Sequence, residues 1–357
     1  MKKKLLWAFV SLVIAGLTVW AVASSSRSFS PQALWNEIRH AHKGWFAAAL
    51  LAMFGFIFFE GMAIVRVTTR LGYRKSPLNG TVYGASDVYF SAITPSASGG
   101  QPVCAWFMIR DGIPGAVTTV TLLITLVMYT LALLLSGIVV MLLCFPVFLS
   151  FSQLARVMIL LGSCVLLFLG LFFLLLLRRP KILHRICGGF LHFLEKIHLM
   201  RGAKRLREKL NTVMEEYSLC SKMLFGKNRM LLLESFFWNL CQRLSYFLVT
   251  FLLFMAVGRG TATGARATAV QCLSCVGSNC IPIPGAMGAA DYMLLDGFGR
   301  FLPEDSAVTM EMLCRGITFY GSVFVGLLIV IIGYFAGRRK KLAGAEQVQK
   351  TNEEHTL

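Results

Sequence analysis

A chain of 357 residues, of which 56% are apolar, carries more hydrophobic surface than a soluble domain of this length can bury. Several apolar runs exceed the ~20 residues that cross a hydrocarbon core, most plainly 122–143 and 157–177. The net charge of +18 comes without a nucleic-acid-binding motif, and its basic residues cluster at the ends of apolar runs, as in loops that face anionic lipid. We therefore predict an all-α, polytopic integral membrane protein that contacts membrane phospholipid and not nucleic acid.

Six full crossings are predicted within a single membrane domain at 1–342. The first resembles a signal peptide, but the multi-spanning chain that follows favours an uncleaved span. The crossings lie at about 5–22, 45–65, 117–143, 155–177, 231–257 and 307–335.

Lys and Arg residues set the expected orientation. They precede the first crossing at 2–4, follow the second at 66–75 and follow the last at 338–341. The largest excess lies in 178–229, with thirteen Lys or Arg against four Glu. These segments and both termini are therefore expected in the cytoplasm. Within 178–229, apolar residues at helical spacing favour basic amphipathic helices on the headgroups over a solvated linker, and the polar tail at 343–357 is expected to be disordered.

This orientation leaves two stretches that cannot cross once. Residues 75 and 178 lie on the same side, and the two crossings between 117 and 177 already make an even count. Residues 79–113 must therefore enter from the cytoplasmic face and return, and the same argument makes 266–300 a re-entrant hairpin from the outside. We expect six full helices and two re-entrant helical hairpins in a pseudo-inverted arrangement.

Each predicted hairpin contains a break in which proline removes a backbone donor and glycine permits unusual angles. Irregular backbone at membrane depth is tolerated only where protein buries it or water reaches it, so the breaks are expected to meet around a polar cavity near mid-depth. Two irregular surface loops are the alternative. The break residues are Pro95, Gly99, Gly100 and Pro102 in the first hairpin, and Pro282, Pro284, Gly285 and Gly288 in the second.

Ionisable residues inside predicted spans mark a candidate site for a lipid headgroup. The planar donors of arginine can hold two phosphate oxygens, while a carboxylate can accept a cationic headgroup or a proton. The alternative is that these residues only neutralise one another, as the i, i+4 spacing of a Glu and an Arg in the last crossing would allow. The candidates are Arg243, Arg315, Asp291, Glu311, Arg110 and Gln242.

Other polar positions are given no role. Glu60 and Glu234 are interpreted as residues at the membrane interface. Cys272-x-x-Cys275 with Cys280 is the one metal-like spacing, but no histidine lies nearby, so no metal is expected. The sequence has no phosphate loop, nucleophile elbow or His-Glu-x-x-His motif, so neither a cofactor nor a nucleotide-driven pump is expected.

The two breaks carry a family resemblance. The run Thr94-Pro-Ser-Ala-Ser-Gly-Gly-Gln-Pro, followed by Arg110-Asp-Gly, resembles the first signature of the lysylphosphatidylglycerol synthase transmembrane-region family. The run from Pro282 to Asp291 is similar to the second, and Arg315 to Tyr320 with Gly326 is also similar. Asp291 departs from the pattern, because the family more often has Glu there.

The resemblance implies a flippase-like membrane region that in bifunctional members precedes a soluble domain, which transfers an amino acid to phosphatidylglycerol. The 357 residues leave no room for such a domain after the last crossing. The expected function is therefore translocation of a polar-headed phospholipid, such as lysylphosphatidylglycerol, across a bacterial plasma membrane, in support of resistance to cationic peptides. A membrane-embedded transferase and a partner subunit for a separate lipid aminoacyltransferase are the alternatives, and a homo-oligomer is left open.

Overall fold

The computed structural model describes most of the chain between residues 31 and 336. Within that part every regular element is a helix, as the apolar composition predicts. The predicted first crossing at 5–22, most of 178–229, the tail at 343–357 and Pro95 lie outside the described residues. The described ranges are 31–94, 97–179, 181–182, 184–185, 188–189, 229–279 and 281–336.

In the described part of the chain, five helices are long and apolar enough to cross a membrane. They coincide with the five predicted crossings that fall there, so the protein is a multi-pass helical membrane protein. The last is Glu304–Ala336, which begins with α14 (Glu304–Arg315) and a π-helix, η3 (Gly316–Gly321). The others are α3 (Lys43–Arg70), α6 (Gly115–Leu143), α8 (Gln153–Arg178) and α11 (Arg229–Ala256).

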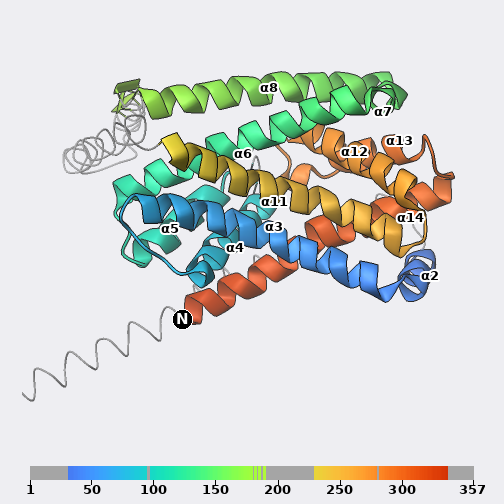
Figure 1. Ribbon diagram of the computed structural model, residues 1–357, viewed down its shortest axis with the longest axis horizontal. Helices are drawn as coiled ribbons and strands as arrows, with labels where there is room; N and C mark the ends of the chain where they lie inside the picture. Colours follow the sequence, from blue (N-terminus) through green and yellow to red (C-terminus); the bar gives the residue numbers. More distant parts are fainter. Residues whose placement is uncertain are drawn as a thin grey trace, which may run out of the picture.

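Helices α3 and α11 form the centre of the bundle, where they pack against each other along their lengths (Figure 1). Of the most apolar 18-residue stretch of each helix, 61% is buried inside the protein. The corresponding share in α8, which lies at the edge of the bundle, is 28%. Burial explains why α3 and α11 tolerate polar residues that a lipid-facing helix would not. Two short helices, α2 (Pro31–His40) and α7 (Phe145–Ser150), precede α3 and α8.

Two helix–break–helix units coincide with the segments predicted as hairpins. The first is α4 (Pro77–Ile93) and α5 (Gly100–Arg110), with α4 capped by the Ser76 hydroxyl, which accepts from the Asn79 N–H. The second is α12 (Thr261–Ser278), a short 3-10 turn η2 (Pro284–Ala286) and α13 (Ala289–Phe298). In each unit the two helices pack against each other, and η2 packs against α4, so the second unit touches the first.

Backbone contact holds the first unit against α3. A Cβ added at Gly61 would lie 2.0 Å from the carbonyl oxygen of Gly80, and one at Gly84 would lie 2.6 Å from the backbone N of Gly61. Small residues four apart on one helix permit such close approach, which replaces the hydrophobic driving force that lipid cannot supply. This contact fixes where α4, and therefore the first break, lies relative to α3.

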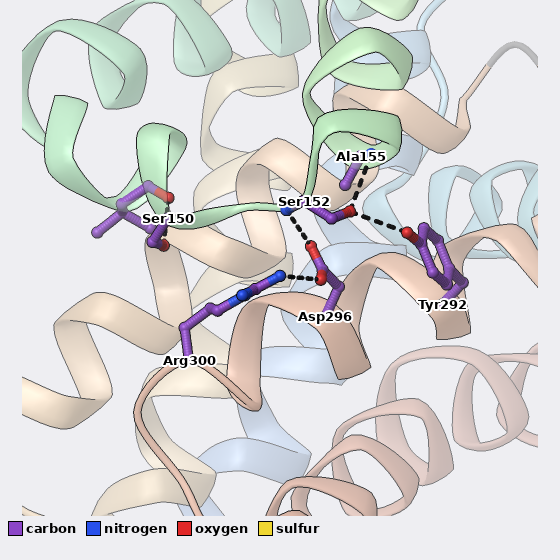
Figure 2. A network of polar contacts seen from close by, with 7 residues as sticks. Ser150, Ser152, Ala155, Tyr292, Asp296 and Arg300 are labelled. Atoms are coloured by element: carbon purple, nitrogen blue, oxygen red, sulfur yellow. Dashed lines mark hydrogen bonds and ion pairs between the residues drawn. The ribbon is translucent and has the colours of Figure 1, made fainter.

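Side-chain hydrogen bonds hold the second unit at the start of α8 (Figure 2). Asp296 of α13 accepts from the backbone N–H of Ser152 at 2.7 Å and from Arg300 at 2.7 Å. The Ser152 hydroxyl lies 2.9 Å from the Tyr292 hydroxyl and also caps α8 by accepting from the Ala155 N–H. Because Asp296 and Tyr292 lie one turn apart, a single face of α13 is tied to the α7–α8 turn.

We expect Gly61→Ala to lower the free energy of unfolding by about 2 kcal/mol, because the added methyl group overpacks a backbone contact. Gly170→Ala in α8 is the matched control, since its Cβ would meet no atom closer than 3.5 Å and alanine favours a helix. Thermal unfolding of both variants in detergent measures the difference. Equal stability of the two variants would contradict the close α3–α4 contact.

Candidate functional site

Arg243 lies on the inner face of α11, where it is 6% exposed. Its guanidinium carbon lies 4.4 Å from the ring centroid of Tyr129, 5.1 Å from that of Phe56 and 5.6 Å from that of Tyr246. Among the described residues, no carboxylate lies within ion-pair distance of this guanidinium. Aromatic faces stabilise a desolvated cation only in part, so Arg243 is a buried charge able to take an anionic partner.

A chain of hydrogen bonds connects Arg243 to the first break. Arg243 Nε donates to Gln242 Oε1 at 2.9 Å, and Gln242 Nε2 donates to a carboxylate oxygen of Glu60 on α3. Glu60 is 5% exposed and lies against Asp87 of α4, carboxyl group to carboxyl group. Asp87 accepts from Gln101 Nε2 at 3.0 Å, in the first turn of α5. The network therefore joins α11, α3 and both helices of the first unit.

The aromatic neighbours of Arg243 reach the second break. The Tyr129 hydroxyl donates to Asn279 Oδ1 at 3.1 Å, and Asn279 caps the end of α12 directly before the break. The Tyr246 hydroxyl interacts with Thr318 in η3. Contacts through Gln242, Glu60, Asp87 and Gln101 therefore connect Arg243 to the first break. Contacts through Tyr129 and Asn279 connect it to the second.

Arg315 forms a second centre with Asp291. Its Nε lies 2.6 Å from Asp291 Oδ1, and its terminal nitrogen donates to the carbonyl oxygen of Gly285 at 3.2 Å. The guanidinium carbon lies 4.7 Å from the ring centroid of Phe319, and Arg315 is 5% exposed. One buried guanidinium therefore connects the last span to η2 and to α13.

Glu311 also interacts with the Asp291 carboxylate and is 2% exposed. The i, i+4 spacing had suggested an ion pair between Glu311 and Arg315, but Arg315 pairs with Asp291 instead. Directly after Arg315 the helix widens into η3, a π-helix. Such bulges are common at functional sites, because they turn side chains out of the regular helical register.

The second break depends on glycine. Gly285 has φ of +59° and Gly288 has φ of +79°, a region that side-chain-bearing residues rarely adopt. A Cβ at Gly285 would lie 2.1 Å from the Phe319 ring, and the Gly288 N–H donates to Asp291 Oδ2 at 2.8 Å. Pro282 lies in non-helical chain before η2, and Pro284 begins η2. The break therefore presents one carboxylate, Asp291, to Arg315.

The first break is held by Thr94, whose hydroxyl accepts from the Gly99 N–H at 2.9 Å. Gly100 begins α5, and a Cβ there would lie 2.2 Å from Asp87 Oδ1, so glycine brings the chain against this carboxylate. Pro102 lies in the first turn of α5, where its missing N–H leaves no helical bond unmade.

The structure separates Arg110 from the other candidates. Arg110 Nε lies 3.5 Å from Asp111 Oδ1, and its terminal nitrogen donates to the Gly333 carbonyl oxygen at 3.3 Å. Asp111 in turn accepts from Asn79 and Tyr83 of α4. This group closes the end of the first unit opposite its break, whereas Gln242, Arg243, Asp291, Glu311 and Arg315 gather around the two breaks.

The interpretation of Glu60 as a membrane-interface residue was wrong, because Glu60 is buried at the centre of the network. Sequence reasoning also missed Asp87, Tyr129 and Asn279. A carboxylate inside a predicted hairpin is itself a signal, since such charges are costly and are kept for a partner. For Tyr129 and Asn279, nothing in the sequence indicated that they meet. Glu234, by contrast, is partly exposed and pairs with Arg70.

Two pockets of about 400 and 410 Å³ open elsewhere on the molecule, and Arg243 and Arg315 line neither. One lies between α2 and α14, the other between α3 and α11. At the two breaks, the polar groups are joined to one another by direct contacts. The structure thus presents a state in which the candidate headgroup ligands are occupied by protein.

We expect a double-mutant cycle of Asp291→Asn and Arg315→Gln to give a coupling energy of about 2 kcal/mol, because each buried partner leaves the other uncompensated. The pair of Asp296 and Arg300, whose arginine side chain is 44% exposed against 6% for that of Arg315, is the control and should couple by less than about 1 kcal/mol. Reversible unfolding in detergent micelles measures both cycles. Equal coupling in the two pairs would contradict the buried ion pair.

The comparisons with known proteins give a family. Residues 7–326 match the family described as the lysylphosphatidylglycerol synthase TM region. No curated protein and no solved structure matches the chain. The match covers both breaks and the helices that carry Glu60, Arg243 and Arg315. The chain therefore belongs to the lysylphosphatidylglycerol synthase transmembrane-region family, whose name connects it to the metabolism of this lipid.

Proposed function

We propose that the protein is a flippase-like lipid translocase that moves a polar-headed phospholipid across the bacterial plasma membrane. The observation that carries the proposal is Arg243, a buried cation without a carboxylate partner in the described residues, connected by side chains to two broken helical units. A charge at membrane depth is costly and usually serves a substrate path. Membership of a family named for a lipid supports the same substrate class.

The path we propose lies between two re-entrant hairpins that approach from opposite faces. Helices α5 and α13 have 11 and 10 residues, about 17 and 15 Å at 1.5 Å per residue. Neither length covers a hydrocarbon core of about 30 Å. The hairpins would bring backbone and polar side chains to mid-depth from both sides, as in transporters built on discontinuous helices. Acyl chains would remain in the bilayer during headgroup passage.

In this mechanism the headgroup exchanges with protein contacts. A lipid phosphate would bind Arg243, which has no carboxylate within ion-pair distance among the described residues, and would replace Asp291 on Arg315, because guanidinium binds phosphate and carboxylate with the same donors. Breaking the contacts of Arg315 to Asp291 and to the Gly285 carbonyl would release η2 from the last span. Lipid binding would thereby open the protein from the closed state, in which the polar groups bind one another.

The charges favour a headgroup of mixed sign. Two arginines suit the phosphate, while the carboxyl groups of Glu60, Asp87, Asp291 and Glu311 suit ammonium groups. Aminoacylated phosphatidylglycerol, such as lysylphosphatidylglycerol, carries both within one headgroup. Its appearance in the outer leaflet would lower the negative surface potential and support resistance to cationic peptides.

Both termini would lie in the cytoplasm, where a separate lipid aminoacyltransferase could supply the substrate. A membrane-embedded transferase is the second candidate, because the family description contains the word synthase. It would use a carboxyl group such as Asp291 or Glu311 as acid or base. A variant that loses translocation but keeps lipid aminoacylation would distinguish the two functions.

We expect liposomes containing the purified protein to expose labelled lysylphosphatidylglycerol from the inner leaflet, and Arg243→Ala or Arg315→Ala to reduce the rate at least tenfold, because either change removes a phosphate ligand. The assay measures how fast an impermeant reagent reaches the label. Arg300→Ala is the control, since this exposed arginine lies outside the network. Arg243→Lys should retain part of the rate, because it keeps the charge without the planar donors.

Wild-type rates in both arginine variants would contradict the assignment of the site. Exposure of no lipid by folded wild-type protein would contradict translocation, and aminoacylation of phosphatidylglycerol by that protein would favour the transferase. Retention volume and helical content verify that each variant is folded.

The re-entrant arrangement predicts which positions share a side of the membrane. Cysteines introduced at Arg74 and Gly115, which flank the first unit, should react with an impermeant thiol reagent from the cytoplasmic side. Those at Ala262, in the first turn of α12, and at Glu304, which follows the second unit, should react from the outside. Labelling above that of the parent chain in oriented vesicles gives the result. Reaction of Arg74→Cys and Gly115→Cys from opposite sides would mean that the first unit crosses fully.

A further inference from the structure

The pocket of about 410 Å³ between the last turns of α3 and the first turns of α11 has no part in the path described above. It opens on the outside of the bundle, at the end where α3 finishes and α11 begins. Its wall combines one arginine, a tryptophan and several apolar side chains. The lining residues are Arg66, Met230, Leu233, Glu234, Phe237 and Trp238.

The pocket and its rim carry one net positive charge, because Arg66 and Arg70 both interact with the single carboxylate of Glu234. Glu234 is bound by Arg70 outside the pocket, whose Nε donates to Oε2 of this carboxylate at 3.2 Å. Arg66 is exposed, and no ion pair to it is present in the part of the chain that the structure describes. Its guanidinium carbon lies 5.7 Å from the Trp238 ring centroid. A guanidinium held over an indole with its donors free is suited to an anion.

An apolar track leads away from this charge along the outer face of α11. Its residues are spaced by 3, 4, 7 and 4 positions, so they share one face of the helix. All are exposed in the isolated chain, whereas the opposite face carries the buried Asn239 and Gln242. A free phosphate ion would make no use of such a track. The track residues are Met230, Leu233, Phe237, Leu244 and Leu248, which are 68, 63, 57, 53 and 45% exposed.

We infer that this pocket binds one anionic phospholipid from the leaflet at that end of the bundle. Arg66 binds the phosphate, Trp238 packs against the glycerol region, and an acyl chain follows the track on α11. Tryptophan suits this depth, because its ring is apolar and its N–H is polar. Phosphatidylcholine fits less well, since its choline cancels the charge that Arg66 recognises. The site does not depend on translocation, because none of its ligands belongs to the network of Arg243 and Arg315.

The test uses the full chain in phosphatidylcholine vesicles, with phosphatidylglycerol that carries bromine on its acyl chains as the probe. Bromine quenches a nearby indole, and the signal of Trp238 among the six tryptophans is the difference between the wild-type chain and Trp238→Phe. We expect brominated phosphatidylglycerol to be preferred over brominated phosphatidylcholine about fivefold at Trp238, the factor typical of one basic residue near a charged surface.

Arg66→Gln should abolish this preference. Arg74→Gln, which removes an exposed arginine from the loop after α3, should retain it. Loss in both variants would show a general surface potential and overturn the site, as would equal quenching by both brominated lipids in the wild-type chain. Inorganic phosphate in excess should leave the preference unchanged. If phosphate removes the preference, the pocket binds the anion alone and the inferred lipid site is wrong.

Discussion

The buried guanidinium of Arg243 is the constraint around which the rest of the molecule is arranged. It lies against aromatic faces and one amide instead of a carboxylate, so its charge is only partly compensated. Such a cation is tolerated at this depth because α3, α6 and α11 surround it with packed side chains. Through its neighbours the same residue is connected to both chain breaks, which lie far apart in the sequence.

The two breaks use different means to the same end. At the first, glycines allow α4 to touch the backbone of α3 and allow α5 to begin against Asp87. At the second, glycines with positive φ let Asp291 reach Arg315 while the Gly285 carbonyl accepts from the same guanidinium. Irregular backbone inside a membrane is tolerated where protein buries it or water reaches it, and here the Thr94 hydroxyl, the Arg315 guanidinium and the Asp291 carboxylate bind backbone groups of the two breaks.

A translocation path must be closed when empty, or it would leak ions. For the proposed translocation the described state would be the closed one, because carboxyl, amide and guanidinium groups at the two breaks bind one another. In the proposed mechanism, a headgroup that carries both phosphate and ammonium would replace these contacts pair by pair, so the path would open only for such a substrate. The π-helix after Arg315 interrupts the regular α-helical hydrogen bonding of the last span beside this site.

Hydropathy along the sequence was sufficient to predict the helical membrane class and the five spans that the structure describes. Glycine and proline residues were sufficient to predict the positions of both breaks. Both signals are local properties of the chain. Arg243 and Arg315 were singled out by the cost of a charge inside a span, and the structure buries both. The partners did not follow: Arg315 pairs with Asp291 across a break rather than with Glu311 one turn away, and Glu60 faces Asp87 and Gln242 inside the bundle. Only tertiary packing decides which faces of helices meet, since a carboxylate has the same cost in sequence whether it lies at an interface or at the centre of a network.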